Sequence, residues 1–484
     1  MTCKLCAALV ALLALGGCAT RPVNPPLAHA DHKVGYRFEA REHLLRDRDN
    51  LVILAFSGGG TRAAAFSYGV LEALRKIEVD APGRGKVRAI DEVGVITGVS
   101  GGSFTALAYG LYGDKLFDQY EKRFLKRNVE GELFGRAATP TYWGSLMSTG
   151  WGRSELAADF YDEILFNGAT FADLQRRDGP MIVAAATDVS SGARFYYTQT
   201  MFDIICSDLA GVRLARAASS SSAVPVVFSP VTFDNYGGSC GFREPPWLEN
   251  IADARHPVRP AARSKRQLAD MRLYEDSKDR PYIHLVDGGV ADNLGIRGVL
   301  DIIDEFEALR LLGQPTPIDH YKRIAVVVVN SLSSPKTDWD KHVDKPGTFD
   351  VFMQATAVPI DHYSFEAIEL LRDTAARWKT MRGIRDSGAI SDKSSPALLE
   401  VMRSPGAELY VVDVSFAALG NADERDYLNQ LPTTFVLPDE AVDRLRAAAG
   451  RIMYESPEFR RLLADIAATA ATAPTGAGAP ASRP

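Results

Sequence analysis

Short apolar runs alternate along this chain with segments of helical periodicity. Runs of strand length, rich in Val, Ile and Ala, begin near residues 51, 93, 181, 282, 323 and 408. Segments with apolar residues three and four positions apart begin near residues 63, 103, 292, 362 and 438. Several strand-like runs lack polar alternate positions, which is typical of parallel strands buried on both faces. The pattern predicts an α/β fold with a mostly parallel central sheet covered by helices on both faces.

The chain is long enough for three average domains, but one α/β unit with insertions also accommodates its 484 residues. We expect one domain over residues 46–466, with insertions at residues 113–178 and 234–280. The first insertion contains Phe134, Trp143 and Trp151, and the second contains Trp247. Such segments form either a lid over a site or additional core, and aromatic residues on helices belong more often to a core.

The N-terminus has the composition of a bacterial secretion signal. A positive charge precedes an apolar stretch over residues 7–15, which is too short to cross a bilayer. The Leu-Gly-Gly-Cys sequence at residues 15–18 resembles the lipobox of bacterial lipoproteins. The resemblance implies a signal over residues 1–17 and a lipid anchor on Cys18. Ala19 resembles the outer-membrane sorting pattern, so we expect an envelope protein facing the periplasm. An ordinary cleaved signal with an unanchored product is the alternative.

Two flanking segments have compositions typical of unfolded chain. Residues 18–45 combine three prolines with many charges and predict a tether between the lipid and the fold. Residues 467–484 are rich in Ala, Pro, Gly and Thr and predict a disordered tail.

Charge and cysteine content narrow the possible functions. The formal net charge is −6, which is not the basic footprint of a nucleic-acid-binding protein, so a nucleic-acid partner is not expected. Cys206 and Cys240 remain beyond the lipobox. An oxidising periplasm permits a disulfide between them, and two buried free thiols are the alternative.

A Gly-x-Ser-Gly-Gly motif follows the second strand-like run. Ser100 lies at its centre, between Gly98 and the pair Gly101 and Gly102, and a helical segment follows. A serine at such a turn projects its hydroxyl from a strained backbone, and small neighbours prevent clashes with a substrate. A second Gly-x-Ser-x-Gly occurs at Ser239, but the paired prolines that follow cannot begin a helix. The sequence therefore predicts Ser100 as a nucleophile.

A triple glycine follows the first strand-like run. Gly58, Gly59 and Gly60 precede a helical segment, and Arg62 lies at its start. Backbone amides exposed in such a turn form an anion-binding nest, and the arginine adds charge or braces the loop. A nucleotide-binding loop is the alternative, but a Walker loop needs Gly-Lys-Ser/Thr where this chain has Gly-Thr-Arg.

A third block, Asp287-Gly288-Gly289, follows the strand-like run near residue 282. The carboxyl ends of parallel strands share one edge of a sheet, so we expect Asp287 near Ser100 and the triple glycine. An exposed aspartate is a weak base, and burial must raise its pKa if it is to accept a proton from serine. A simple Asp-Gly turn is the alternative.

Together the three blocks resemble the motifs of the patatin-like phospholipases over about residues 51–296. Gly58, Gly59, Gly60 and Arg62 match the glycine-rich oxyanion motif, Ser100 matches the nucleophile, and Asp287 matches the aspartate of the Asp-Gly-Gly motif. Residues 218–228 are similar to a further family segment, Ala-Ser-x-Ala-x-Pro-x-x-Phe. The resemblance implies a Ser-Asp dyad that hydrolyses phospholipids or other acyl-ester lipids, with no metal and no cofactor.

Two alternatives remain open. A Ser-His-Asp triad needs a later histidine, for which the candidates are His320, His342 and His362. None of these lies in a convincing motif, and His284 lies inside a strand-like run. A lipid-binding or envelope-scaffold lipoprotein without turnover is the other alternative, although binding alone needs neither the serine nor the aspartate.

Overall fold

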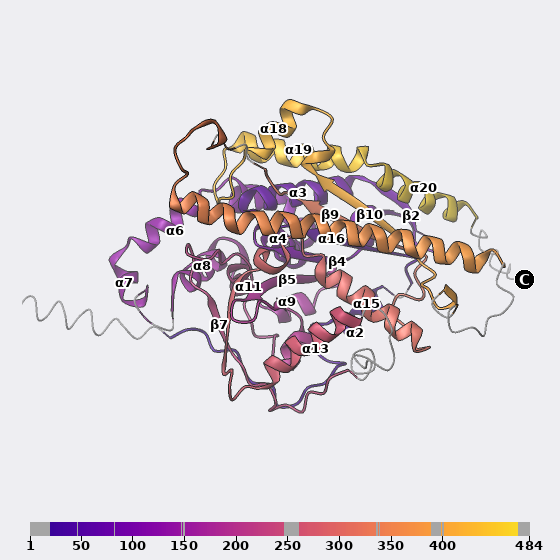
Figure 1. Ribbon diagram of the computed structural model, residues 1–484, viewed down its shortest axis with the longest axis horizontal. Coiled ribbons are helices and arrows are strands. Elements are labelled where there is room, and N and C mark those ends of the chain that lie inside the picture. The colour runs from indigo at the N-terminus through magenta and orange to yellow at the C-terminus, as the bar shows by residue number, and fades with distance from the viewer. Residues whose placement is uncertain are drawn as a thin grey trace, which may run out of the picture.

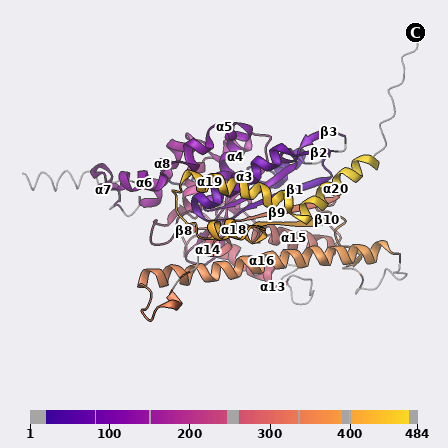
Figure 2. The ribbon, with the colours of Figure 1, turned by 90° about the horizontal axis from the view of Figure 1, so that it is seen from above.

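The computed structural model describes residues 20–45, 47–81, 83–146, 148, 151–245, 261–334, 337, 339–388, 398 and 401–472. Within these residues a central sheet carries helices on both faces (Figure 1). Figure 2 shows one layer that contains α3, α4 and α19 and another, across the sheet, that contains α15 and α16. The α/β architecture expected from the sequence is confirmed.

The strands of the described chain follow the order β10-β9-β1-β4-β5-β8-β7, and β6 pairs with β5 beside this path. They are β1 (Asn50–Phe56), β4 (Val93–Val99), β5 (Met181–Asp188), β6 (Arg194–Tyr196), β7 (Val231–Asp234), β8 (Tyr282–Asp287), β9 (Arg323–Asn330) and β10 (Glu408–Ser415). A separate antiparallel hairpin consists of β2 (Glu78–Ala81) and β3 (Gly85–Arg88). The strands from β10 to β5 are parallel, so their carboxyl ends share one edge.

Strand β8 runs antiparallel to its neighbours β5 and β7, so the expected parallel direction is wrong. Its last residue nevertheless reaches the expected edge. Asp287 pairs with Ala186, and Ala185 pairs with Val99, the residue before Ser100. Strand β8 runs toward the sheet from beyond the carboxyl ends of the parallel strands, and its last residue lies beside Ser100. The aspartate is therefore at the edge where the sequence predicted it.

Alternate residues of the central strands enter two separate cores. Leu54 and Val327 belong to the larger core, whereas Ile53 and Val326 belong to the smaller one. Helices α3 (Gly60–Lys76), α4 (Gly101–Tyr112), α11 (Leu214–Ser221), α19 (Asp439–Glu455) and α20 (Pro457–Thr472) contribute to the larger core. Helices α15 (Arg297–Leu311) and α16 (Thr348–Asp386) contribute to the smaller core. Burial on both faces explains the unbroken apolar runs of β1 and β9.

The remaining helices are short. They are α2 (Phe38–Arg41), α5 (Leu116–Tyr120), α6 (Val129–Ala137), α7 (Pro140–Leu146), α8 (Arg153–Tyr161), α9 (Phe171–Gln175), α10 (Gln199–Ile204), α13 (Ala261–Glu275), α14 (Gly289–Asp292) and α18 (Ala422–Asn429). Single helical turns occur at η1 (Glu42–Leu44), η2 (Ala89–Glu92), η3 (Gly113–Lys115), η4 (Glu121–Leu125), η5 (Asp162–Phe166), η6 (Trp339–Lys341) and η7 (Phe416–Ala418).

Most of the first predicted insertion, residues 113–178, belongs to the core. Phe124 and Tyr161 both pack on Phe104 of α4, each with ring centroids 4.7 Å apart. Only its tip, formed by α6 and α7, projects from the body (Figure 1). Of the second insertion, residues 246–260, including Trp247, lie outside the described residues.

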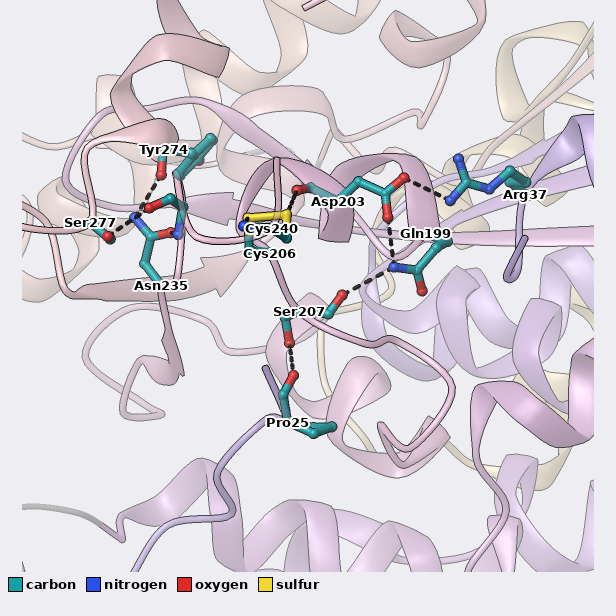
Figure 3. Close-up of a disulfide and its surroundings, with 11 residues drawn as sticks. Pro25, Arg37, Gln199, Asp203, Cys206, Ser207, Asn235, Cys240, Tyr274 and Ser277 are labelled. Carbon is teal, nitrogen blue, oxygen red and sulfur yellow. Dashed lines mark hydrogen bonds and ion pairs between the residues drawn. A yellow bond between two sulfur atoms is a disulfide. The ribbon is translucent and has the colours of Figure 1, made fainter. Parts of the chain in front are cut away.

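The segment expected to be a tether, residues 18–45, packs on the domain from residue 20 onward, so that expectation is wrong. Tyr36 is 1% exposed, and its hydroxyl accepts the amide of Ile182 on β5 at 2.7 Å. Arg37 and Asp203 form a buried ion pair of 2.7 Å (Figure 3). The charges and prolines of this segment are matched to specific partners on the domain, which composition alone cannot reveal.

Cys206 and Cys240 form a disulfide, with their Cα atoms 5.4 Å apart (Figure 3). The bond joins the end of α10 to the loop after β7. The neighbouring Ser207 donates a hydrogen bond of 2.8 Å to the carbonyl of Pro25. The disulfide region therefore also holds the N-terminal segment.

Helix α20 continues to Thr472, so the domain extends beyond the expected boundary at residue 466. The rest of the expected tail, residues 473–484, lies outside the described residues, as do the expected signal and Cys18. In the part of the chain that the structure describes, no helix is long and apolar enough to span a bilayer.

We predict that Tyr36→Ala lowers the free energy of unfolding by about 3–5 kcal/mol, because it removes a buried ring. The exposed neighbour substitution Val34→Ala changes it by less than about 0.5 kcal/mol. Urea unfolding of the two variants checks this, and equal stabilities would restore the tether interpretation.

Candidate active site

Ser100 lies at the turn between β4 and α4 in a conformation that is rare for a residue with a side chain. Its φ is 47° and its ψ is −121°, and it is 5% exposed. A Cβ atom at position 101 would lie 2.0 Å from the carbonyl oxygen of Gly60, and one at position 102 would lie 2.6 Å from that of Ser57. A Cβ atom at position 98 would lie 2.8 Å from the Cα atom of Ser103 on α4. Gly101 and Gly102 therefore allow the triple-glycine loop to pack directly on the serine turn, and Gly98 allows α4 to pack closely on the end of β4.

The triple glycine lies at the start of α3, beside Ser100. Gly59 and Gly60 have positive φ values of 137° and 60°. In the described chain their amides donate no hydrogen bond to protein, whereas the Gly58 amide donates to the carbonyl of Asn293 at 2.8 Å. Two free amides at a helix N-terminus form a site for a negative charge. The Gly58 amide is already engaged, so its part is to fix the loop.

Arg62 braces this loop from behind. Its guanidinium donates to the carbonyls of Ser331 and Leu431 at 2.8 and 2.6 Å and to the Thr433 hydroxyl at 3.1 Å. Burial lowers the pKa of Arg62 to about 10, which leaves it charged at neutral pH. Of the two roles open from the sequence, bracing is the one that these contacts support.

Asp287 lies at the end of β8 with its carboxylate toward Ser100. The carboxylate accepts the Gly289 amide at 2.7 Å and a hydrogen bond from the Ser100 hydroxyl. Burial raises the pKa of Asp287 to about 6, and these two hydrogen bonds oppose the rise. A carboxylate with this pKa is a far better base near neutral pH than an exposed aspartate.

Helix α11 connects the serine to the aspartate. The Ser100 amide donates to the Ser221 hydroxyl at 2.9 Å, and the Gly288 amide donates to the Ser221 carbonyl at 3.1 Å. The Asp287 amide donates to the carbonyl of Ala223 at 3.0 Å. In the sequence, residues 218–228 were notable only for their similarity to a family segment. In the structure this segment holds the backbones of Ser100 and Asp287.

Sequence reasoning missed three residues that hold the triple-glycine loop. The carbonyl of Thr434 accepts the Thr61 amide at 2.8 Å, and Ser331 donates to the carbonyl of Gly58 at 3.0 Å. The Oδ1 atom of Asn293 would lie 2.3 Å from a Cβ at position 58 and 2.8 Å from one at position 289. Asn293 follows the Asp-Gly-Gly block closely enough to suggest a role. The other two residues lie in no recognisable motif.

The remaining candidate residues lie elsewhere. His284, His320, His342 and His362 are all exposed, whereas Ser100 and Asp287 are buried. Ser239 is exposed in a turn beside the disulfide, and no helix begins there. Among the described residues, no cluster of three His, Cys, Asp or Glu side chains could hold a metal ion.

Comparison with known proteins relates the chain to one family. The model of a family described as patatin-like phospholipase matches residues 54–300, just over half of the chain. No curated protein sequence matches. A structure of human GIVD cytosolic phospholipase A2 aligns with a TM-score of 0.40 and 13% identity over 90% of this chain and 63% of that chain. VipD from Legionella pneumophila aligns with a TM-score of 0.28 and 12% identity over 93% and 73%. This chain thus spans less than two thirds of the human phospholipase chain.

The raised pKa of Asp287 predicts a pH-dependent cost to stability. The unfolded aspartate ionises near 3.8 and the folded one near 6, so the folded state binds the proton more tightly between these values. As the pH rises from 3.8 to 6, the free energy of unfolding of wild type therefore falls by about 3 kcal/mol relative to that of Asp287→Asn. Above pH 6 the difference between the two proteins stays constant. Urea unfolding of both proteins from about pH 4 to 7 checks this. A difference that does not change with pH would show that the carboxyl is not desolvated.

Proposed function

Because the chain belongs to the patatin-like phospholipase family, we propose that it is a serine hydrolase of acyl-ester lipids that uses a Ser-Asp dyad. The observation that carries the proposal is the hydrogen bond from Ser100 to a buried carboxylate whose pKa is raised to about 6. A serine hydroxyl becomes nucleophilic when a positioned base takes its proton. Asp287 is the base in contact with it.

The reaction follows from the positions of these groups. Asp287 takes the hydroxyl proton while the Ser100 oxygen bonds to the ester carbonyl carbon. The carbonyl oxygen becomes an anion, which the free amides of Gly59 and Gly60 stabilise. The tetrahedral intermediate collapses, and the leaving alcohol takes the proton from Asp287. A water molecule then attacks the acyl-serine while the same carboxylate takes its proton, and the bond to Ser100 breaks as Asp287 returns that proton to the serine oxygen, which releases the fatty acid.

The substrate that best fits the family is a phospholipid or another lipid with an ester-linked acyl chain. The residues in the reaction need neither a metal nor a cofactor, because carboxylate, hydroxyl and amides supply every proton transfer and charge contact. A lipobox at residues 15–18 supports placement of the enzyme in the bacterial envelope. A lipid on Cys18 would add a membrane anchor there, facing the periplasm on the outer membrane.

The contacts at the site favour the dyad over both alternatives. A triad needs an imidazole against the serine, and the candidate histidines are exposed, whereas Ser100 is buried. A scaffold lipoprotein needs no strained serine. Ser100 at a φ of 47° costs free energy that only a function at that residue explains.

We predict that a fluorophosphonate labels the wild-type chain at Ser100. Ser100→Ala abolishes labelling, and Ser239→Ala retains it, because Ser239 lies in an exposed turn where no helix begins. Asp287→Asn slows labelling by about 10²–10⁴-fold, the usual contribution of a positioned base. Mass spectrometry of the labelled peptide and fluorescence of the adduct measure both results.

The controls separate chemistry from folding. Circular dichroism must show that each variant is folded, and the release of fatty acid from phospholipid vesicles must fall together with labelling. Labelling that persists in Ser100→Ala would contradict the assigned nucleophile. Labelling that is lost in His362→Ala but kept in Asp287→Asn would establish the triad instead.

A further inference from the structure

Exposed apolar side chains surround the edge of the sheet where Ser100 lies. Val290 is 49% exposed and follows the Asp-Gly-Gly block directly. Val226 is 59% exposed, with a φ of 73° that is unusual for a β-branched residue, three positions after Ala223. Val436 is 37% exposed and lies two positions after Thr434. We call Val226, Val290 and Val436 the apolar rim, because each adjoins a segment that holds the site.

Helix α16 extends past this edge. Arg372 and Arg382 of α16 contact Asp413 and Glu408 of β10 at 3.2 and 3.1 Å, so the helix runs antiparallel to the strand. At about 1.5 Å per helical residue, the part from Thr348 to Arg372 is about 36 Å long, while β10 ends only about 7 Å beyond Asp413. The N-terminal part of α16 therefore extends past the end of β10, and the part before Ser364, which is buried, is about 23 Å long. Figure 2 shows this end free of neighbouring elements.

The projecting part of α16 is mostly apolar in sequence, and its described side chains are exposed. Residues 348–360 contain one charged residue, Asp350, and three uncharged polar residues, Thr348, Gln354 and Thr356, and the others are Phe, Val, Met, Ala, Pro and Ile. Every described side chain from residue 348 to 358 is exposed, and Val351 and Val358 are 48% and 42% exposed. Apolar residues exposed on a projecting helix are typical of a surface that contacts lipid or another protein.

A second apolar projection lies at the same end of the molecule. Figures 1 and 2 both show α6 and α7 projecting at the same end of the molecule as the free end of α16, and Figure 2 shows them on the opposite side of the sheet from it. Phe134 and Trp143 on these helices are 63% and 49% exposed. Glu130 of α6 accepts the Phe435 amide at 3.2 Å, which connects this projection to the segment that holds the triple glycine. The catalytic edge is thus flanked by two exposed apolar helical segments.

We propose that the free half of α16, the α6–α7 tip and the apolar rim enter the surface of a phospholipid bilayer and set the catalytic edge on it. The proposal deepens the proposed function and rests on it for the lipid substrate. A helix that pairs with another protein needs one apolar stripe, whereas the apolar residues of α16 spread over more than one stripe and leave Asp350 and Gln354 as a polar side, as in a helix that lies in a membrane interface. Aromatic residues such as Trp143 are typical of the membrane interface.

The first test measures insertion directly in the full chain. Tryptophan is introduced by Val358→Trp at the free end of α16, or by Ile384→Trp at its far end, as a matched control that is 41% exposed in wild type. The two positions are about 40 Å apart along the helix. Vesicles of phosphatidylethanolamine and phosphatidylglycerol with brominated acyl chains should quench the fluorescence added by Val358→Trp about twofold or more, and leave that of Ile384→Trp unchanged. A lipid anchor alone cannot give this difference. Equal quenching at both positions, or none at either, overturns the proposal.

The second test measures the consequence for catalysis. The double substitution Val351→Asp with Val358→Asp should lower the ratio of turnover on vesicles to turnover on a water-soluble short-chain ester by about tenfold or more. Ile384→Asp should leave this ratio unchanged. An unchanged ratio in the double variant overturns the proposal.

Two combined outcomes separate bilayer insertion from catalysis and from dimerisation. If wild type hydrolyses neither substrate while Val358→Trp is still quenched, the proposed function fails and the bilayer surface stands. If Val358→Trp is not quenched and the double variant turns a sedimenting dimer into a monomer, a second copy of the chain covers α16 and the bilayer proposal is overturned.

Discussion

The turn at Ser100 is the constraint on which the rest of the site depends. A serine at a φ of 47° directs its hydroxyl away from the sheet, and this strain persists only because the surroundings hold it on several sides. Glycines at positions 101 and 102 let the carbonyls of Gly60 and Ser57 approach more closely than any side chain would allow. The hydroxyl of Ser221 fixes the backbone from the other side. Strand, helix and glycine loop therefore form one packed unit.

The buried carboxylate of Asp287 is the second costly feature of the site. Desolvation makes Asp287 costly to ionise in the fold, and the same desolvation makes it an effective base. The enclosing structure must offset this cost. The fold is stabilised by two cores, one on each face of the sheet. The N-terminal segment adds further contacts through Tyr36 and Arg37. These interactions offset the cost of the buried carboxylate.

The sequence predicted six strands, the sheet class and the location of Ser100 and Asp287, because each depends on local pattern, whereas the short strands β2, β3, β6 and β7 were not predicted. Apolar runs are sufficient to identify buried strands, and Gly-x-Ser-Gly-Gly requires only its own strand and helix. Strand direction was not accessible, since the antiparallel entry of β8 depends on the path of the chain between β7 and β8. The brace from Leu431 and Thr434 was not accessible either, because these contacts join the loop to residues about 370 positions later that carry no motif. Residues 20–45 were misjudged because composition does not show whether a polar side chain has a partner.

The central claim is that Asp287 is the base for Ser100, and the pH dependence of fluorophosphonate inactivation tests it most directly. The account predicts an inactivation rate constant that rises about tenfold per pH unit in acid and levels off above a midpoint near 6, set by the raised pKa of Asp287. The midpoint should be absent in Asp287→Asn and unchanged in His320→Ala, His342→Ala and His362→Ala. A midpoint that survives in Asp287→Asn, or that disappears with one of the histidines, would contradict the dyad.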